Sequence, residues 1–186
     1  MGKVYATISD ELATWIKAQR IFFVATAPLA ATGHVNVSPK NCDALKVLGP
    51  LELAYQDYTG SGAETAAHIR ENGRIVIMFC AVEGPPKIVR LHGSATLISR
   101  SDVRFAKVSE HFANNPGTRA FIHVVVGRVS DSCGFGVPIY EFKAHRDTLT
   151  RWADRKGPAE LERYRSEKNL QSIDGLPAFD LPKTSS

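Results

Sequence analysis

An alternating strand that runs directly into a glycine turn and a helix is the feature that most constrains this chain. Residues 51–57 alternate between apolar and polar side chains, as a strand with one buried face does. The turn Thr59–Gly62 follows, and Ser61 and Glu64 stand in the S-x-x-E spacing of a capping box, which predicts a helix that begins at Ser61. Glycines allow a close approach to the backbone, and the first amides of a helix favour an anion. The turn is therefore either an anion-binding site or an ordinary capped connection, and the segment alone favours neither.

The same segment imitates a dinucleotide-binding unit. Gly60 and Gly62 have the spacing of such a unit, and an acid, Glu83, follows at about the 20-residue distance of its ribose ligand. The third glycine position, however, holds Thr65, and a central parallel strand would be apolar on both faces rather than alternating. The rest of the chain also lacks repeated βαβ units. These features argue against a dinucleotide-binding fold.

Composition places the chain among soluble globular proteins of single-domain size. Its 186 residues include 44% hydrophobic and 23% charged residues, with a formal net charge of +4. Lysines and arginines are scattered among acids, without a basic stripe interleaved with aromatic residues, so nucleic acid is not expected as a partner. The six histidines show no metal-binding spacing, and no metal site is expected.

Cysteine usage and hydropathy indicate a cellular compartment. Cys42, Cys80 and Cys133 are an odd number without C-x-x-C spacing, which favours a reducing environment. The first residues lack the apolar stretch of a signal peptide, and no apolar run reaches the length of a membrane span. We therefore expect a cytoplasmic protein with no membrane partner.

Strand and turn signals along the chain predict a mainly β fold with flanking helices. Strands are expected at residues 21–26, 34–38, 44–47, 51–57, 75–81, 87–98, 120–129 and 139–142. Helices are expected after Ser9, from Ser61, from Ser101 to Phe112, and at 148–156 and 160–168 with a break at Gly157. Gly93 indicates a bulge inside its strand. Short links between most strands favour a closed β-barrel over a layered α/β sheet.

The order of these segments resembles the flavin-binding split-barrel family of pyridoxamine-5′-phosphate-oxidase-like proteins. The resemblance rests on the strand His34–Lys40, the alternating strand with its Thr-Gly-Ser-Gly turn, the helix ending at Arg70–Gly73, the apolar strand after it, and Ile88–Gly93. It covers about residues 8–143 and implies a six-stranded split β-barrel, FMN as cofactor, and a homodimer whose two flavin sites straddle the interface. Residues 1–143 then form the flavin-binding domain, and residues 144–186 form a C-terminal helical extension and tail.

The resemblance also implies which residues contact the flavin. They lie on the second strand, at the end of the alternating strand, at the turn and helix start, and on the strand after the Pro-Pro turn. These residues are Val37, Ser38, Lys40, Asp57, Tyr58, Thr59, Ser61, Gly62, Thr65 and Arg90. Many relatives carry Arg or Lys at the helix start, where this chain has Glu64 and Thr65. Glu64 would repel a phosphate there unless capping engages it.

The implied function is that of an oxidoreductase acting on a small molecule, with the flavin ring carrying the hydride or electron chemistry. No acid–base pair stands out in the sequence, so no catalytic residue is assigned. The alternative is a non-catalytic module that binds flavin, haem or deazaflavin. In the extension, Leu149 and Trp152, and then Leu161 and Tyr164, predict an apolar stripe on each helix. These stripes pack either on the barrel or over the flavin site.

Overall fold

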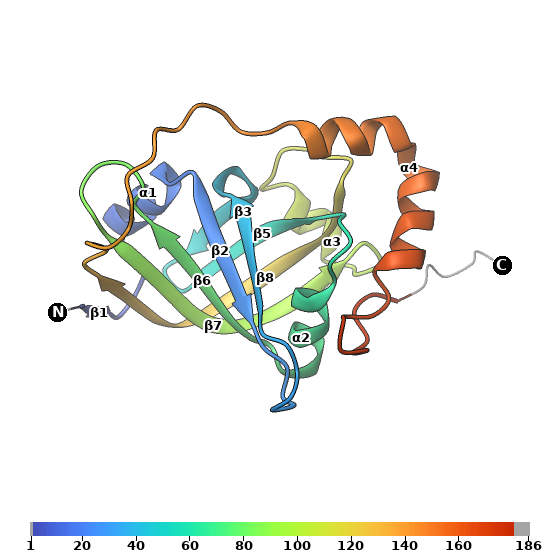
Figure 1. The fold of residues 1–186 in the computed structure, drawn as a ribbon, viewed down its shortest axis with the longest axis horizontal. Coiled ribbons are helices and arrows are strands. Elements are labelled where there is room, and N and C mark those ends of the chain that lie inside the picture. The colour runs from blue at the N-terminus through green and yellow to red at the C-terminus, as the bar shows by residue number, and fades with distance from the viewer. Residues whose placement is uncertain (1, 181–186) are drawn as a thin grey trace.

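A curled, mostly antiparallel sheet with flanking helices forms a split half-barrel (Figure 1) in the computed structural model, which describes residues 2–180. The strand order is β3-β2-β6-β7-β8-β5-β4, with β1 paired to β8, so the sheet has eight strands where the resemblance implies six. The strands are β1 (Val4–Tyr5), β2 (Ile21–Thr26), β3 (Asn36–Asn41), β4 (Leu45–Gly49), β5 (Glu52–Tyr58), β6 (Arg74–Cys80), β7 (Ile88–Ser99) and β8 (Thr118–Ser132). The helices are α1 (Asp10–Ala18), the 3-10 turn η1 (Cys42–Ala44), α2 (Glu64–Asn72), α3 (Phe105–Ser109) and α4 (Thr148–Lys168).

The core lies inside the curl of the sheet and is built from alternate residues of β2, β6 and β7, whereas β5 is buried on both faces from Leu53 to Asp57. Phe22 on β2, Tyr55 on β5 and Phe79 on β6 meet there, with ring centroids of Phe22 5.5 Å from Tyr55 and 6.0 Å from Phe79. Each large side chain of this kind contributes about 1.5–3 kcal/mol when it is fully buried. The sheet therefore closes around one aromatic and aliphatic centre.

The bulge predicted at Gly93 is confirmed. The register between β7 and β8 shifts between His92 and Gly93. A Cβ atom on Gly93 would lie 2.3 Å from the carbonyl oxygen of Val125, a distance that no side chain tolerates. Glycine at this position lets the two longest strands stay paired while the sheet bends.

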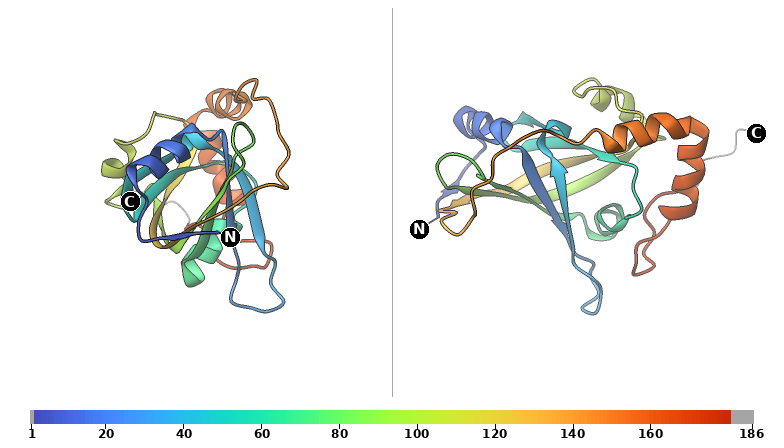
Figure 2. Two further views of the ribbon diagram at one scale, coloured as in Figure 1. Left: turned by 90° about the vertical axis from the view of Figure 1, so that its left-hand side faces the viewer. Right: turned by 45° about the horizontal axis from the view of Figure 1, so that its top comes forward.

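Helices cover the ends of the half-barrel. Ser9 caps α1 by accepting a hydrogen bond from the Leu12 amide at 3.2 Å, as expected. The break in α4 is also confirmed, because Gly157 has φ +70 and the helix changes direction there. Figure 2 shows the long linker that leads from β8 to α4 and the tail that returns from α4 toward the end of the barrel where α2 lies.

Two predicted elements differ most from the structure. The expected helix from Ser101 to Phe112 is shortened to α3. The Arg104 amide donates to the Asp102 side chain at 2.9 Å before the helix begins, and isolated turns replace it after Ser109. Residues 139–142 form no strand. Their contacts are single hydrogen bonds, such as that from the Tyr140 amide to the Val82 carbonyl, rather than a ladder. Among residues 2–180, no helix combines the length and the apolar character that crossing a bilayer requires.

Candidate functional site

The glycine turn leads into α2 differently from the capping-box prediction. The helix begins at Glu64, its N-cap residue is Ala63, and no side chain caps it. The Glu64 carboxylate instead accepts a hydrogen bond from the backbone amide of Ile173 at 3.3 Å. The capping box was therefore wrong, because the C-terminal tail supplies a donor that the local sequence does not reveal.

A buried carboxylate at the end of β5 organises the residues beside the turn. Asp57 is 2% exposed and lies between two cations, with its carboxylate oxygens 2.7 Å from Arg119 Nε and 3.3 Å from Lys40 Nζ. Burial by itself would raise the pKa of the Asp57 carboxyl, but the charges and hydrogen bonds of Arg119 and Lys40 outweigh it and hold that pKa below its ordinary value. The carboxylate is thus charged at neutral pH.

Arg119 connects that carboxylate to the turn. Its two terminal nitrogens donate to the carbonyl oxygens of Gly60 at 3.2 Å and Gly62 at 2.8 Å, while Nε holds Asp57. The planar guanidinium group fixes all three acceptors in one geometry. The carbonyl groups of the turn are therefore held toward Arg119.

Side-chain hydroxyl and amide groups form a second cluster next to the turn. The Asn36 amide donates to Thr65 Oγ1 at 3.0 Å and to Thr26 Oγ1 at 3.3 Å, and it accepts from the Ser38 hydroxyl at 3.2 Å. Thr26 Oγ1 lies 3.0 Å from Nδ1 of His68, which is fully buried. Burial lowers the pKa of His68, so the ring is neutral near pH 7.

These groups surround a surface hollow of about 300 Å³, here called the turn hollow. Its lining residues come from β3, the end of β5, the turn, the start of α2 and the start of β8. They are Asn36, Ser38, Pro39, Lys40, Asp57, Tyr58, Gly60, Gly62, Glu64, Thr65 and Arg119. Hydroxyl groups, two cations and the first amides of α2 suit a phosphate-bearing ligand, whereas the Glu64 carboxylate opposes one.

The structure brings six of the ten predicted site residues together around the turn hollow. They are Ser38, Lys40, Asp57, Tyr58, Gly62 and Thr65. Thr59 belongs to the same turn but is buried, and its hydroxyl donates to the Gly117 carbonyl at 2.9 Å. Ser61 is exposed between the two glycines.

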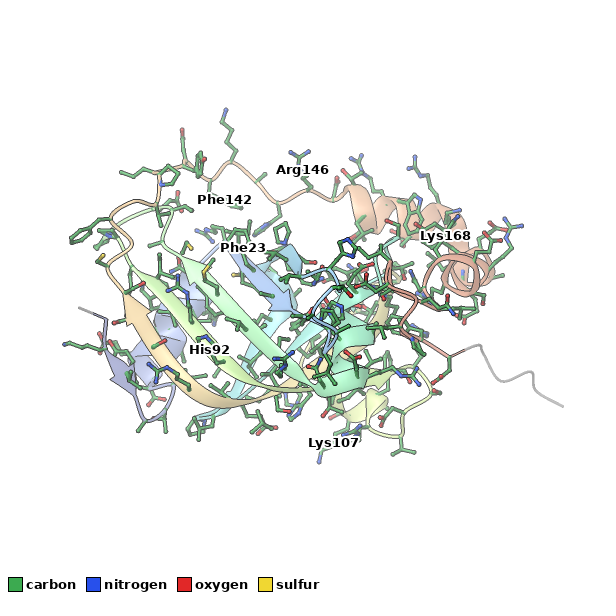
Figure 3. The ribbon with its side chains drawn as sticks, turned by 60° about the horizontal axis from the view of Figure 1, so that its bottom comes forward. Phe23, His92, Lys107, Phe142, Arg146 and Lys168 are labelled. Carbon is green, nitrogen blue, oxygen red and sulfur yellow. The ribbon has the colours of Figure 1, made fainter. Side chains whose placement is uncertain are left out.

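Val37 and Arg90 lie on the outer face of the sheet instead. Arg90 pairs with Met78, Met78 with Phe23, and Phe23 with Pro39, so these residues form one row across four strands. Three strand spacings separate its ends, which is roughly 14 Å. Figure 3 labels Phe23 in this row. Arg90 Nη1 donates to Ser132 Oγ at 3.1 Å, away from the turn.

Sequence reasoning missed Asn36, Arg119 and Asn169. The alternation of Asn36, Ser38 and Lys40 along one side of a strand was a readable signal for the first. Arg119 directly precedes an apolar run, and the expected strand began one residue too late to include it. Asn169 reaches the turn from a segment more than 100 residues away, and no local pattern could indicate that contact.

Within residues 2–180, no group of three histidine, cysteine, aspartate or glutamate side chains is arranged to hold a metal ion. Cys42, Cys80 and Cys133 are free thiols, and burial raises the pKa of Cys42 to about 12. None of the three thiols lines the turn hollow.

Comparisons with known proteins agree with this fold. The family model described as pyridoxamine 5′-phosphate oxidase matches residues 8–133. A relative from Aspergillus flavus, the pyridoxamine 5′-phosphate oxidase family protein ustO, is 37% identical over 192 residues, which cover 94% of this chain and 77% of the relative. Crystal structures of HupZ from Group A Streptococcus share 24% identity, with TM-scores of 0.53 and 0.51. The match to the first structure, which is of a HupZ variant, covers 67% of this chain and 99% of the HupZ chain. The match to the second structure covers 66% of this chain and 91% of the HupZ chain. That likeness shows the fold.

Proposed function

This chain belongs to the pyridoxamine 5′-phosphate oxidase family, and on that basis we propose that it is an FMN-binding flavoprotein that acts as an oxidoreductase on a small molecule. The observation that supports FMN is the turn hollow, where Lys40, Thr65 and the first turn of α2 surround a space beside a glycine turn. The three free thiols support a reducing, cytoplasmic setting.

The residues at the turn hollow have separate tasks in this proposal. Lys40 and the Thr65 hydroxyl hold the phosphate, together with the amides at the start of α2, which no helix-cap side chain among residues 2–180 engages. Asp57 and Arg119 keep Lys40 and the turn in place, since both are buried and paired with each other. FMN, when bound, supplies the hydride or electron transfer.

We also propose that the active form is a homodimer. Phe23, Val76 and Met78 lie on the outer face of β2 and β6 and are only partly buried in the single chain. Val37 on the neighbouring strand β3 is 61% exposed. A second copy of the chain would cover this apolar surface, on which Arg90 also lies.

The second candidate is a flavin-binding module without turnover. It is favoured by the state of the acids at the turn hollow: Asp57 is buried and paired with two cations, and Glu64 is bound by the tail. Asp57 is therefore held in its charged form, and one oxygen of Glu64 is occupied by the Ile173 amide. Oxidation of reduced nicotinamide by the purified, FMN-loaded protein separates the two candidates, because only the oxidoreductase turns over.

Titration with FMN tests the proposal. We expect flavin fluorescence to be quenched and the visible spectrum of the bound flavin to appear. A protein that neither quenches FMN fluorescence nor carries a flavin spectrum contradicts the assignment. Sedimentation equilibrium of the FMN-loaded protein at micromolar concentration tests the dimer, and a monomer with bound flavin would rule it out.

A further inference from the structure

The C-terminal extension contacts the glycine turn at several points. Asn169 Nδ2 donates to the Gly60 carbonyl at 2.7 Å. Arg165 Nε donates to Thr59 Oγ1 at 2.9 Å, and the Phe179 ring lies 4.9 Å from the guanidinium carbon of Arg119. None of these three residues lines the turn hollow. Within residues 144–180, the extension therefore supports the turn and contributes no residue to the lining of the hollow.

The side chain of Asn169 is fully buried, and its Nδ2 atom donates to the Gly60 carbonyl. Its Oδ1 atom is buried without a hydrogen-bond partner among residues 2–180, which is costly for an amide. Asn169 follows α4 with φ −115, so its backbone does not need the left-handed conformation for which asparagine is often used. The donor to Gly60 is the remaining physical reason for an asparagine here.

The hydrogen bonds at Gly60 and Gly62 decide what the turn offers to a ligand. The Gly60 carbonyl is bound by both Asn169 and Arg119, and the Gly62 carbonyl by Arg119. Within residues 2–180, the amides of Ser61 and Gly62 donate to no backbone acceptor. A carbonyl group turned toward an anion repels it, whereas a free amide attracts it. Holding the carbonyls therefore leaves the turn with donors for a phosphate.

We propose that Asn169 and Phe179 are positioning residues for the phosphate end of the flavin site: Asn169 acts directly on the Gly60 carbonyl, and Phe179 acts through Arg119. This inference rests on the proposed binding of FMN. It gives residues outside the span matched by the family model a defined task in cofactor selection. Specifically, the extension makes the site prefer a flavin that carries a phosphate.

FMN and riboflavin distinguish this role from general stabilisation, because riboflavin lacks the phosphate. The test variant is Asn169→Leu, which keeps the number and branching of the side-chain heavy atoms and removes the donor. We expect the Kd for FMN to rise about tenfold, the value of a lost hydrogen bond near a charge, with the Kd for riboflavin unchanged. The matched control is Leu161→Ala, which removes a buried apolar side chain of the same extension that does not line the turn hollow. It should lower the melting temperature without changing the FMN-to-riboflavin ratio.

The outcomes separate the two proposals. A wild-type protein that binds FMN no more tightly than riboflavin contradicts the phosphate site itself. A wild-type preference for FMN that Asn169→Leu leaves intact, or a variant that weakens both ligands equally, overturns the positioning role alone. Phe179→Leu provides a second variant should Asn169→Leu not fold. It should reduce the FMN preference, and Phe179→Tyr, which keeps an aromatic face over Arg119, should restore it.

Discussion

Two hollows lie near opposite ends of β8, and they differ in how deeply their charged side chains are buried. The larger, here called the α1 hollow, has a volume of about 700 Å³ and lies among α1, the loop between β6 and β7, and Asp131–Cys133. The turn hollow is less than half as large. In the α1 hollow, Arg20 and Glu83 are 3.9 Å apart with side chains 47% and 46% exposed. In the turn hollow, the central carboxylate is 2% exposed and has two cationic partners.

The stability of the folded protein depends much more on the charged groups of the turn hollow than on those of the α1 hollow. Exposed ion pairs contribute little, and the charges of the α1 hollow can exchange partners with water at small cost. A buried carboxylate requires its partners, so the geometry around Asp57 is fixed whether or not a ligand is present. Pre-arranged polar groups of that kind are what a specific ligand site needs. The smaller hollow is therefore the better candidate site.

The largest expected effect comes from breaking the central pair of the turn hollow. Asp57→Asn leaves the Arg119 guanidinium buried without its counter-charge and should lower the free energy of unfolding by about 3–5 kcal/mol. Arg20→Gln breaks the corresponding pair in the α1 hollow and should cost less than about 1 kcal/mol. Urea denaturation of both variants at pH 7 measures the contrast. Equal losses would remove the distinction between the two regions.

A smaller effect is expected on flavin affinity when charge is changed at the start of α2. Thr65→Glu places a carboxylate where the phosphate is proposed to bind and should weaken FMN binding about tenfold to a hundredfold, the value of a lost charge-assisted contact. Glu64→Gln removes an opposing charge and should tighten FMN binding. Fluorescence titration measures both.

The matched control for these charges lies in the α1 hollow. Lys87→Glu changes the local charge there by two units and removes the cation from the Trp15 ring, 5.1 Å away. FMN affinity should stay at the wild-type value. If Lys87→Glu weakens FMN as strongly as Thr65→Glu, the phosphate binds elsewhere or responds only to the total charge of the protein.

Sequence reasoning predicted the fold well because the fold depends on local signals. The strand expected at residues 51–57, the break at Gly157 and the bulge at Gly93 follow from backbone sterics and from strand and helix periodicity. The single buried face expected for that strand was wrong, because Leu53 to Asp57 are all buried and β5 is covered on both faces. The expected helix after Ser101 was too long at both ends: the Arg104 amide donates to the Asp102 side chain before α3 begins, and only separate backbone turns follow Ser109. Propensity cannot rank such a contact against its competitors.

The candidate site was predictable only in part, for a related reason. Asp57 and Thr65 lie close to the turn because they precede and follow it in the sequence, and Lys40 on β3 reaches Asp57 because the sheet curls. Arg119 and Asn169 reach the turn through contacts between segments far apart in the sequence. The Glu64 carboxylate was expected to cap its own helix, yet the Ile173 amide binds it. Tertiary donors decided each of these positions, and one sequence does not display them.

The smallest expected effect sharpens the comparison through pH. His68 lies behind the turn hollow and is fully buried, and that burial lowers its pKa from 6.5, although the charges of Asp174, Glu71 and Glu64 partly offset the shift. Below pH 6.5 the unfolded chain takes up a proton that the folded chain refuses. The free energy of unfolding should therefore fall as pH drops from 6.5 toward the folded pKa, by at most about 1.4 kcal/mol per pH unit.

Urea denaturation between pH 7.5 and 5.5 measures this slope, and the variant His68→Gln isolates it. Glutamine can still bond to Thr26 Oγ1 but does not titrate, so the variant should lose the His68 part of the slope. Arg20→Gln in the α1 hollow, which no histidine lines, should keep the wild-type slope. If His68→Gln leaves the slope unchanged, the buried ring accepts a proton in the folded protein as readily as in the unfolded chain. The region of the turn hollow would then carry one more positive charge at mildly acidic pH than the structure indicates.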